Sequence, residues 1–104
     1  MRKRVLVAEP DPDVRTLLEH AVRRAGHDAV AHAGRDDVDA IVMEPGCAVA
    51  RSLLDGFDGD VPPVVCVSIY PPESGLAPPE TVAYVLKPST PARVARVLAD
   101  VLEA

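Results

Sequence analysis

Apolar and polar residues follow one another along this chain in two patterns, short apolar runs and helical stripes. Residues 5–8 are four consecutive apolar residues, which is typical of a strand covered on both faces. The apolar residues between 14 and 25 then recur at helical spacing. Asp11 followed by Pro12 is a typical helix start, and Gly26 a typical stop. The pattern therefore predicts a strand followed directly by a helix.

The same two patterns predict the remaining elements. Apolar runs indicate further strands, and apolar stripes after a break indicate further helices; the predicted strands are 28–32, 40–43, 64–69 and 84–86, and the predicted helices are 47–54 and 91–102. Residues 70–80 contain four prolines, so this segment is predicted to be a loop with room for one helical turn after it.

Strands that alternate with helices, without a hairpin signal, favour a parallel sheet with right-handed crossovers. Five short strands in one domain over residues 1–104 fit a flavodoxin-like, doubly wound α/β fold with strand order 2-1-3-4-5. The ligand site of such a sheet lies at the carboxyl ends of its strands. Glu9, Glu44, Ser68 and Lys87 each stand at or just after a predicted strand end, so they are the candidate site residues.

Two connections are too short for a full helix. Residues 33–39 leave room for one turn at most, so the usual second helix of this fold is predicted to be missing or a single turn. Between Ser68 and Lys87 the proline-rich loop leaves room only for a shortened fourth helix. Apolar strand surface should then be uncovered, and such surface marks interaction sites. We expect a homodimer or a protein partner on that face or on the neighbouring last helix.

Composition narrows the function classes. The net charge of −5, from 16 acidic and 11 basic residues, argues against direct nucleic-acid binding. The chain has no apolar run long enough for a membrane span or a signal peptide, so we expect a cytoplasmic protein. Cys47 and Cys66 are predicted to be free thiols. No nucleophile elbow, glycine-rich phosphate loop or His/Cys ligand spacing is present, so we expect neither an enzyme nor a small-molecule substrate.

Four stretches carry a resemblance to a known family. They are VLVAEPDPDVRTLL, DAIVMEP, PPVVCVSIY and AYVLKPSTPARV, the last being the most specific. Together they make the whole chain resemble a response-regulator receiver domain of two-component phosphorelay signalling. In that family an aspartate after the third strand accepts a phosphoryl group, and an acidic pair after the first strand holds magnesium. A lysine contacts the phosphoryl oxygen, while a Ser or Thr and an aromatic residue turn inward as the switch.

The resemblance carries over unevenly. Lys87 matches the lysine, and Ser68 and Tyr84 match the switch residues. Glu44 stands where the acceptor aspartate would be, and Glu9 and Pro10 stand where the acidic pair would be. Pro10 offers no side-chain oxygen, and the neighbouring Asp11 is expected to cap the helix instead of binding a metal. Magnesium is therefore disfavoured, and no cofactor is expected.

These departures predict a degenerate receiver, or pseudo-receiver, that signals through protein contact without aspartyl phosphorylation. In this interpretation Glu44 supplies a permanent negative charge, paired with Lys87 and hydrogen-bonded by Ser68. Three alternatives stay open. The domain could be a conventional receiver that is weakly phosphorylated, or a structural or dimerisation module. The three charged residues could also simply close the top of the sheet, with Ser68 bonded to local backbone and Tyr84 an ordinary half-buried aromatic.

Overall fold

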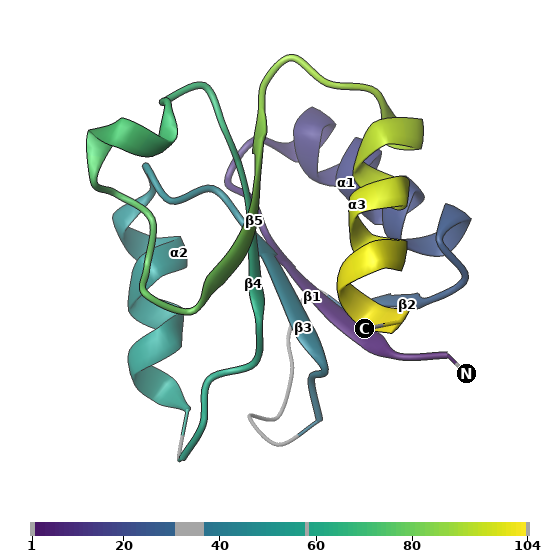
Figure 1. Ribbon diagram of the computed structural model, residues 1–104, viewed down its shortest axis with the longest axis horizontal. Helices are drawn as coiled ribbons and strands as arrows, with labels where there is room; N and C mark the ends of the chain where they lie inside the picture. The colour runs from purple at the N-terminus through teal and green to yellow at the C-terminus, as the bar shows by residue number, and fades with distance from the viewer. Residues whose placement is uncertain (1, 31–36, 58, 104) are drawn as a thin grey trace.

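A computed structural model of the chain describes residues 2–30, 37–57 and 59–103, and the described strands and helices follow one another in the predicted order (Figure 1). The strands are β1 (Arg4–Ala8), β2 (Asp28–Val30), β3 (Ala40–Met43), β4 (Val64–Ser68) and β5 (Thr81–Leu86). The α-helices are α1 (Pro12–Arg24), α2 (Ala48–Ser52) and α3 (Pro91–Glu103). Two short 3₁₀ helices, η1 (Leu53–Gly56) and η2 (Pro72–Ser74), complete the described elements.

The five strands form one sheet in the order β2-β1-β3-β4-β5, and every neighbouring pair is parallel. This confirms the predicted flavodoxin-like, doubly wound topology. The register pairs Ala8 of β1 with Met43 of β3, and Ser68 of β4 with Leu86 of β5. Because these pairs stand level at the carboxyl ends of the strands, the residues that follow them emerge at one edge of the sheet.

Helix α1 begins and ends where the sequence predicts. The carboxylate of Asp11 accepts hydrogen bonds from the backbone N–H groups of Asp13 and Val14, at 2.9 and 3.2 Å. Pro12 occupies the first turn, where its missing N–H leaves no bond unmade. Gly26 follows the helix with a φ of 90°, a left-handed conformation that favours glycine. The cap therefore fixes how the chain enters the helix after β1.

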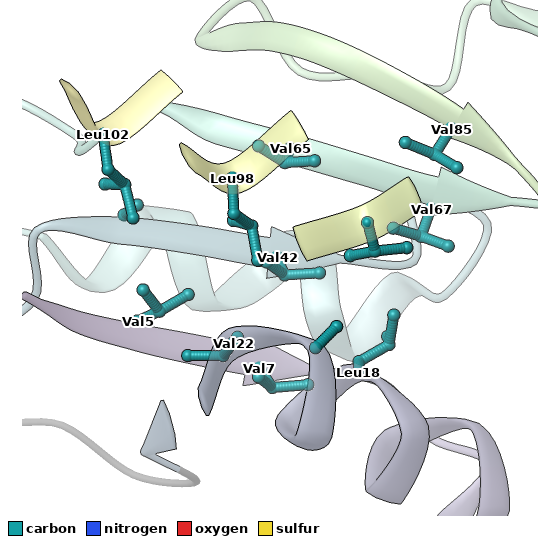
Figure 2. Close-up of a cluster of buried hydrophobic side chains, with 13 residues drawn as sticks. Val5, Val7, Leu18, Val22, Val42, Val65, Val67, Val85, Leu98 and Leu102 are labelled. Atoms are coloured by element: carbon teal, nitrogen blue, oxygen red, sulfur yellow. The ribbon is translucent and has the colours of Figure 1, made fainter. Parts of the chain in front are cut away.

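Helices α1 and α3 cover one face of the sheet and enclose a core of buried apolar side chains (Figure 2). The strands contribute valines to this core, and the helices contribute leucine, valine and alanine. Its largest members include Val5, Val42, Val65, Val22 and Leu98, each at most 1% exposed. The alternation of side chains along β1, β3 and β4 directs these valines to this face.

The opposite face carries α2, η1 and η2 (Figure 1). Between β4 and β5, where residues 69–80 are all described, η2 is the only helical element, which confirms the predicted shortening of the fourth helix. It begins inside the proline-rich segment, not after it, because Pro72 suits a first helical position. The predicted loss of the second helix concerns 33–39, of which 33–36 lie outside the described residues.

Large apolar side chains are exposed on α2 and β5, and also on α1, on η1 and in the segment after β4. Val49 of α2 is 72% exposed, and Leu86 of β5 is 50% exposed. Leu6 of β1 and Ile41 of β3 are buried beneath this layer. The predicted uncovered strand surface is therefore found on the edge strand and not in the centre of the sheet. In the part of the chain that the structure describes, no helix has the length and apolar character needed to cross a membrane.

Several element bounds differ from the sequence-based prediction, most by one or two residues and that of β5 by three. Strand β5 begins at Thr81 rather than Tyr84, because a bulge lies near its start: Val64 pairs with Thr81, whereas Val65 pairs with Ala83. The extra residue breaks the alternation on which strand prediction depends. Strand β4 ends at Ser68, one residue early, and α2 continues through η1. For the second strand, 28–30 is confirmed, and residues 31 and 32 lie outside the described residues.

Candidate functional site

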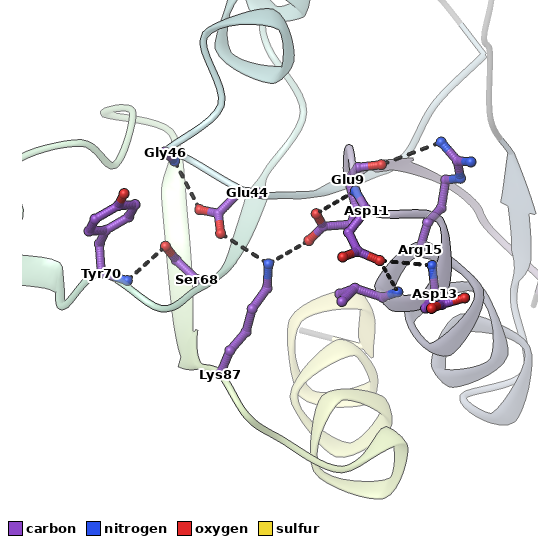
Figure 3. A network of polar contacts seen from close by, with 10 residues as sticks. Glu9, Asp11, Asp13, Arg15, Glu44, Gly46, Ser68, Tyr70 and Lys87 are labelled. Carbon is purple, nitrogen blue, oxygen red and sulfur yellow. Dashed lines mark hydrogen bonds and ion pairs between the residues drawn. The ribbon is translucent and has the colours of Figure 1, made fainter.

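Three charged side chains meet at the carboxyl edge of the sheet (Figure 3). Glu9 follows β1, Glu44 follows β3 and Lys87 follows β5. The Lys87 Nζ donates to Glu9 Oε1 at 2.6 Å and to Glu44 Oε1 at 3.0 Å. The sequence-predicted residues are thus brought together, with one ammonium group between two carboxylates.

The two carboxylates are bound in the same way. Each uses one oxygen for Lys87 and the other for the backbone N–H two residues further on. Glu9 Oε2 accepts from the N–H of Asp11 at 3.1 Å, and Glu44 Oε2 accepts from the N–H of Gly46 at 2.9 Å. All four carboxylate oxygens therefore have a donor, so hydrogen bonds to both oxygens fix the orientation of each carboxylate.

The site is largely shielded from water. The side chain of Glu9 is 2% exposed, that of Glu44 10%, and that of Lys87 16%. Burial raises the pKa of Glu44, but the Ser68 hydroxyl, the Gly46 N–H and the Lys87 ammonium outweigh it and hold that pKa below its ordinary value. Burial lowers the pKa of Lys87, but its bonds to Glu9 and Glu44 raise it overall. The lowered pKa of Glu44 and the raised pKa of Lys87 both favour the charged forms of these two side chains at neutral pH.

The two predicted switch residues lie beside this cluster. Ser68 is fully buried, and its Oγ accepts the backbone N–H of Tyr70 at 3.1 Å. That bond uses an oxygen lone pair, so the hydroxyl proton is free to be donated toward Glu44. Tyr84 is partly buried against the core of the α2 face, and its hydroxyl donates to the carbonyl of Tyr70 at 2.5 Å. Both side chains therefore bind the segment that follows β4.

The remaining predicted residues, Pro10 and Asp11, lie where the chain enters α1. Pro10 is exposed and brings no donor or acceptor side chain. The Asp11 carboxylate caps the helix, as described above. Among the described residues, no group of three or more His, Cys, Asp or Glu side chains is placed to hold a metal ion.

Sequence reasoning missed three residues of this site. Gly46 donates its N–H to Glu44, Tyr70 lies against Gly46 and is bonded by Ser68 and Tyr84, and Arg15 Nη1 approaches the carbonyl of Glu9 at 3.4 Å. For Gly46 and Tyr70, the distance in sequence from the predicted site residues is a signal that could have indicated them. Gly46 and Tyr70 each stand two residues after a predicted site residue, within reach of the same strand ends.

Comparison with known proteins identifies the fold. Solved structures that match the chain are response-regulator receiver domains, and the chain has that fold. It matches a response regulator from Thermotoga maritima with a TM-score of 0.72 and 12% identity, covering 100% of both chains. It also matches the chemotaxis response regulator CheY4 of Vibrio cholerae (TM-score 0.72, 15% identity, covering 98% of this chain and 100% of that one).

A third match is the receiver domain of the sensor histidine kinase PA1611 from Pseudomonas aeruginosa, described with a magnesium ion in its active-site cleft. The TM-score is 0.72 at 18% identity, and the match covers 100% of both chains. No protein-family model matches the chain, and no curated protein matches it in sequence. At these identities the likeness establishes the fold, while the chemistry has to be argued from the residues.

Proposed function

We propose that this domain is a receiver-like signalling module that acts through protein contact and is held in one signalling state without aspartyl phosphorylation. The observation that carries the proposal is Lys87 bound between Glu9 and Glu44. A lysine bonded to a permanent carboxylate makes the contact that a phosphoryl group would otherwise have to supply. The receiver fold and the neighbouring Ser68 and Tyr84 support a signalling role over a purely structural one.

The described side chains do not fit a magnesium ion. Magnesium requires near-octahedral oxygen ligands at about 2.0–2.1 Å. Here the Glu9 and Glu44 oxygens are taken by Lys87 and by backbone N–H groups, the Asp11 carboxylate caps α1, and Pro10 has no oxygen to offer. Metal-assisted transfer of a phosphoryl group to Glu44 would require breaking these bonds.

A titration with magnesium and beryllofluoride, followed by amide NMR shifts, tests this proposal. We expect no saturable shift at Glu9, Glu44, Ser68 or Lys87 in the wild-type chain. The variant Pro10→Asp/Glu44→Asp, which restores an acidic pair and an aspartate at the acceptor position, is the matched positive control. Saturable wild-type shifts at these residues would instead support a conventional, phosphorylatable receiver.

The charge of Glu44 is tested separately. Glu44→Gln keeps the size of the side chain and removes its charge, so Ser68 and Tyr84 should change their amide shifts if the charge holds their state. Glu19→Gln, on α1 and outside the site, is the control for a neutralised glutamate. Unchanged shifts at Ser68 and Tyr84 in Glu44→Gln would favour the simpler interpretation that the ion pairs only close the edge of the sheet.

Protein contact is the remaining part of the proposal. Exposed Val49 and Leu53 lie one helical turn apart, and their apolar surface suits a second copy of the chain or a protein partner. Light scattering over a range of concentrations distinguishes the two. A concentration-dependent dimer supports self-association, whereas a monomer at all concentrations together with no partner in a pull-down would count against the proposed contact.

A further inference from the structure

Tyr70 lies against the one glycine of the candidate site. A Cβ atom placed on Gly46 would come within 2.7 and 2.9 Å of Cε2 and Cδ2 of the Tyr70 ring, closer than side chains pack. The glycine is not required by the backbone, because Gly46 is absent from the residues with positive φ among those described. The contact with Tyr70 is therefore the structural reason for glycine at position 46.

Both backbone polar groups of Tyr70 are hydrogen-bonded to side chains of the site. Its N–H donates to Ser68 Oγ, and its carbonyl accepts the Tyr84 hydroxyl. The ring itself is not a core residue, since Tyr70 is 46% exposed. Figure 3 shows it next to Ser68 and close to the turn that joins Gly46 to Glu44. The residue is therefore held by two hydrogen bonds to its backbone and by the contact of its ring with Gly46, although the ring buries little surface.

We infer that Tyr70 is a positioning residue: its ring, packed on Gly46, holds the Gly46 N–H and the Ser68 hydroxyl against Glu44. The chain of contacts is continuous, from the Glu44 carboxylate through the Gly46 N–H to the Tyr70 ring, and from the Tyr70 carbonyl to Tyr84 on β5. This deepens the proposed function, on which it rests, by naming what keeps the site in one state. It also links the buried charge to the exposed edge strand.

The test uses the full chain and three substitutions at the contact. Gly46→Ala should displace the ring, Tyr70→Ala should remove it, and Tyr70→Phe should keep it. We expect the first two variants to speed amide hydrogen exchange of residues 46 and 70 by at least about tenfold, because local opening becomes easier. Tyr70→Phe should exchange like the wild type. The double variant Gly46→Ala/Tyr70→Ala should match Tyr70→Ala, because the ring that the added methyl group would meet is gone.

A second readout separates positioning from packing. The carboxyl titration of Glu44, followed by ¹³C NMR, should move upward in Gly46→Ala and Tyr70→Ala, because the donors that favour the carboxylate are less well held. Ile69→Ala, which removes the adjacent exposed side chain, is the matched control and should leave the titration unchanged. If a Gly46 variant fails to fold, Tyr84→Phe still tests the other restraint: it removes one hydroxyl and should speed exchange of the Tyr70 amide.

Two results would overturn the inference. One is wild-type exchange and wild-type Glu44 titration in both Gly46→Ala and Tyr70→Ala. The other is an equal effect of Gly46→Ala with and without the Tyr70 ring. These measurements need no partner and no phosphoryl donor. If the contact holds Glu44 as inferred but the magnesium titration shows saturable binding, only the proposed function fails; if exchange is unaffected, only the inference fails.

Discussion

The α1/α3 face of the sheet and the α2/η2 face differ in how they are built. The first is covered by two helices of 13 residues each, and its core residues such as Val5 and Leu98 are fully buried. The second is covered by a five-residue helix and two short 3₁₀ turns, and it exposes Val49 and Leu53. The charged site lies at the edge between them. Both faces have a buried core, which on the α2 side includes Ile41, Met43 and Cys66, so the difference lies in the length of the helices that cover each core.

Truncating one leucine on each face tests most directly whether the two faces contribute differently to stability. Leu98→Ala, in the core of the α1/α3 face, should lower the free energy of unfolding by about 2–5 kcal/mol, because it removes a buried side chain and leaves a cavity. Leu53→Ala, on the α2 face at 44% exposure, should lower it by less than about 1 kcal/mol. Urea unfolding measures both. Equal losses would show that the two faces contribute alike.

Removing the shared cation should produce the next largest effect. Lys87→Met leaves the buried carboxylates of Glu9 and Glu44 without their counter-charge. This should destabilise the fold by about 3 kcal/mol at neutral pH, the low end for breaking a buried ion pair, because the Lys87 side chain is 16% exposed. Lys3→Met changes the only other lysine and serves as the control. The same urea experiment applies. A Lys87→Met protein as stable as the wild type would mean that water or other groups replace the lysine.

The pH dependence of stability should report the same cluster with a smaller amplitude. Glu44 has a lowered pKa, so the stability it contributes is present above its ordinary value of 4.5 and is lost as the pH falls through the folded-state value. Lys87 has a raised pKa, so its contribution is present below 10.5 and is lost as the pH rises through the folded-state value.

Thermal unfolding across the pH range should therefore show decreases at both ends. Glu44→Gln removes the group responsible for part of the acid decrease, so its profile should be flatter there than that of the wild type. The alkaline decrease should be smaller in Lys87→Met, and the part that remains is expected from the Cys66 thiol, whose pKa burial raises above its ordinary value. Parallel wild-type and Glu44→Gln profiles in the acid range, below the ordinary Glu44 pKa of 4.5, would contradict the assignment of the acid decrease to Glu44.

The smallest effect is expected on the exposed α2 surface. Val49→Ser should change the free energy of unfolding by no more than about 0.5 kcal/mol, because its side chain is mostly in water already. It should nevertheless weaken self-association or partner binding if this face makes the contact. Val49→Thr, which keeps the branched shape, is the comparison variant. A loss of more than about 1 kcal/mol in unfolding would show that the face matters for stability after all.

Much of the fold follows from sequence because its signals are local. Asp11 and Pro12 mark the start of α1, and the apolar run before Ser68 marks β4, so the order of strands and helices and the parallel topology could be predicted. The bulge near Val82 could not, since it depends on how β5 pairs with β4. The beginning of β5 was therefore predicted three residues late.

In the candidate site, too, some contacts could be predicted from the sequence and others could not. The meeting of Glu9, Glu44 and Lys87 follows from parallel strands ending at one edge, which sequence order alone implies. The contact between Gly46 and Tyr70 does not, because it joins a turn after β3 to a proline-rich loop after β4. No periodicity reports such a contact. The signalling roles of Ser68, Tyr84 and Lys87 stay predictions that the experiments above address.

The bulge in β5 has a consequence for solubility. Strands at the two edges of a sheet, here β2 and β5, carry unpaired backbone groups that invite edge-to-edge aggregation. Within the residues that the structure describes, β2 comprises three residues, Asp28–Val30, and β5 is interrupted by the irregularity beside Val82. Short edges and bulges are both devices that hinder another strand from pairing in register. A chain that exposes Val82 and Leu86 on its edge strand can therefore present apolar side chains to a partner while its backbone resists growing into a fibre.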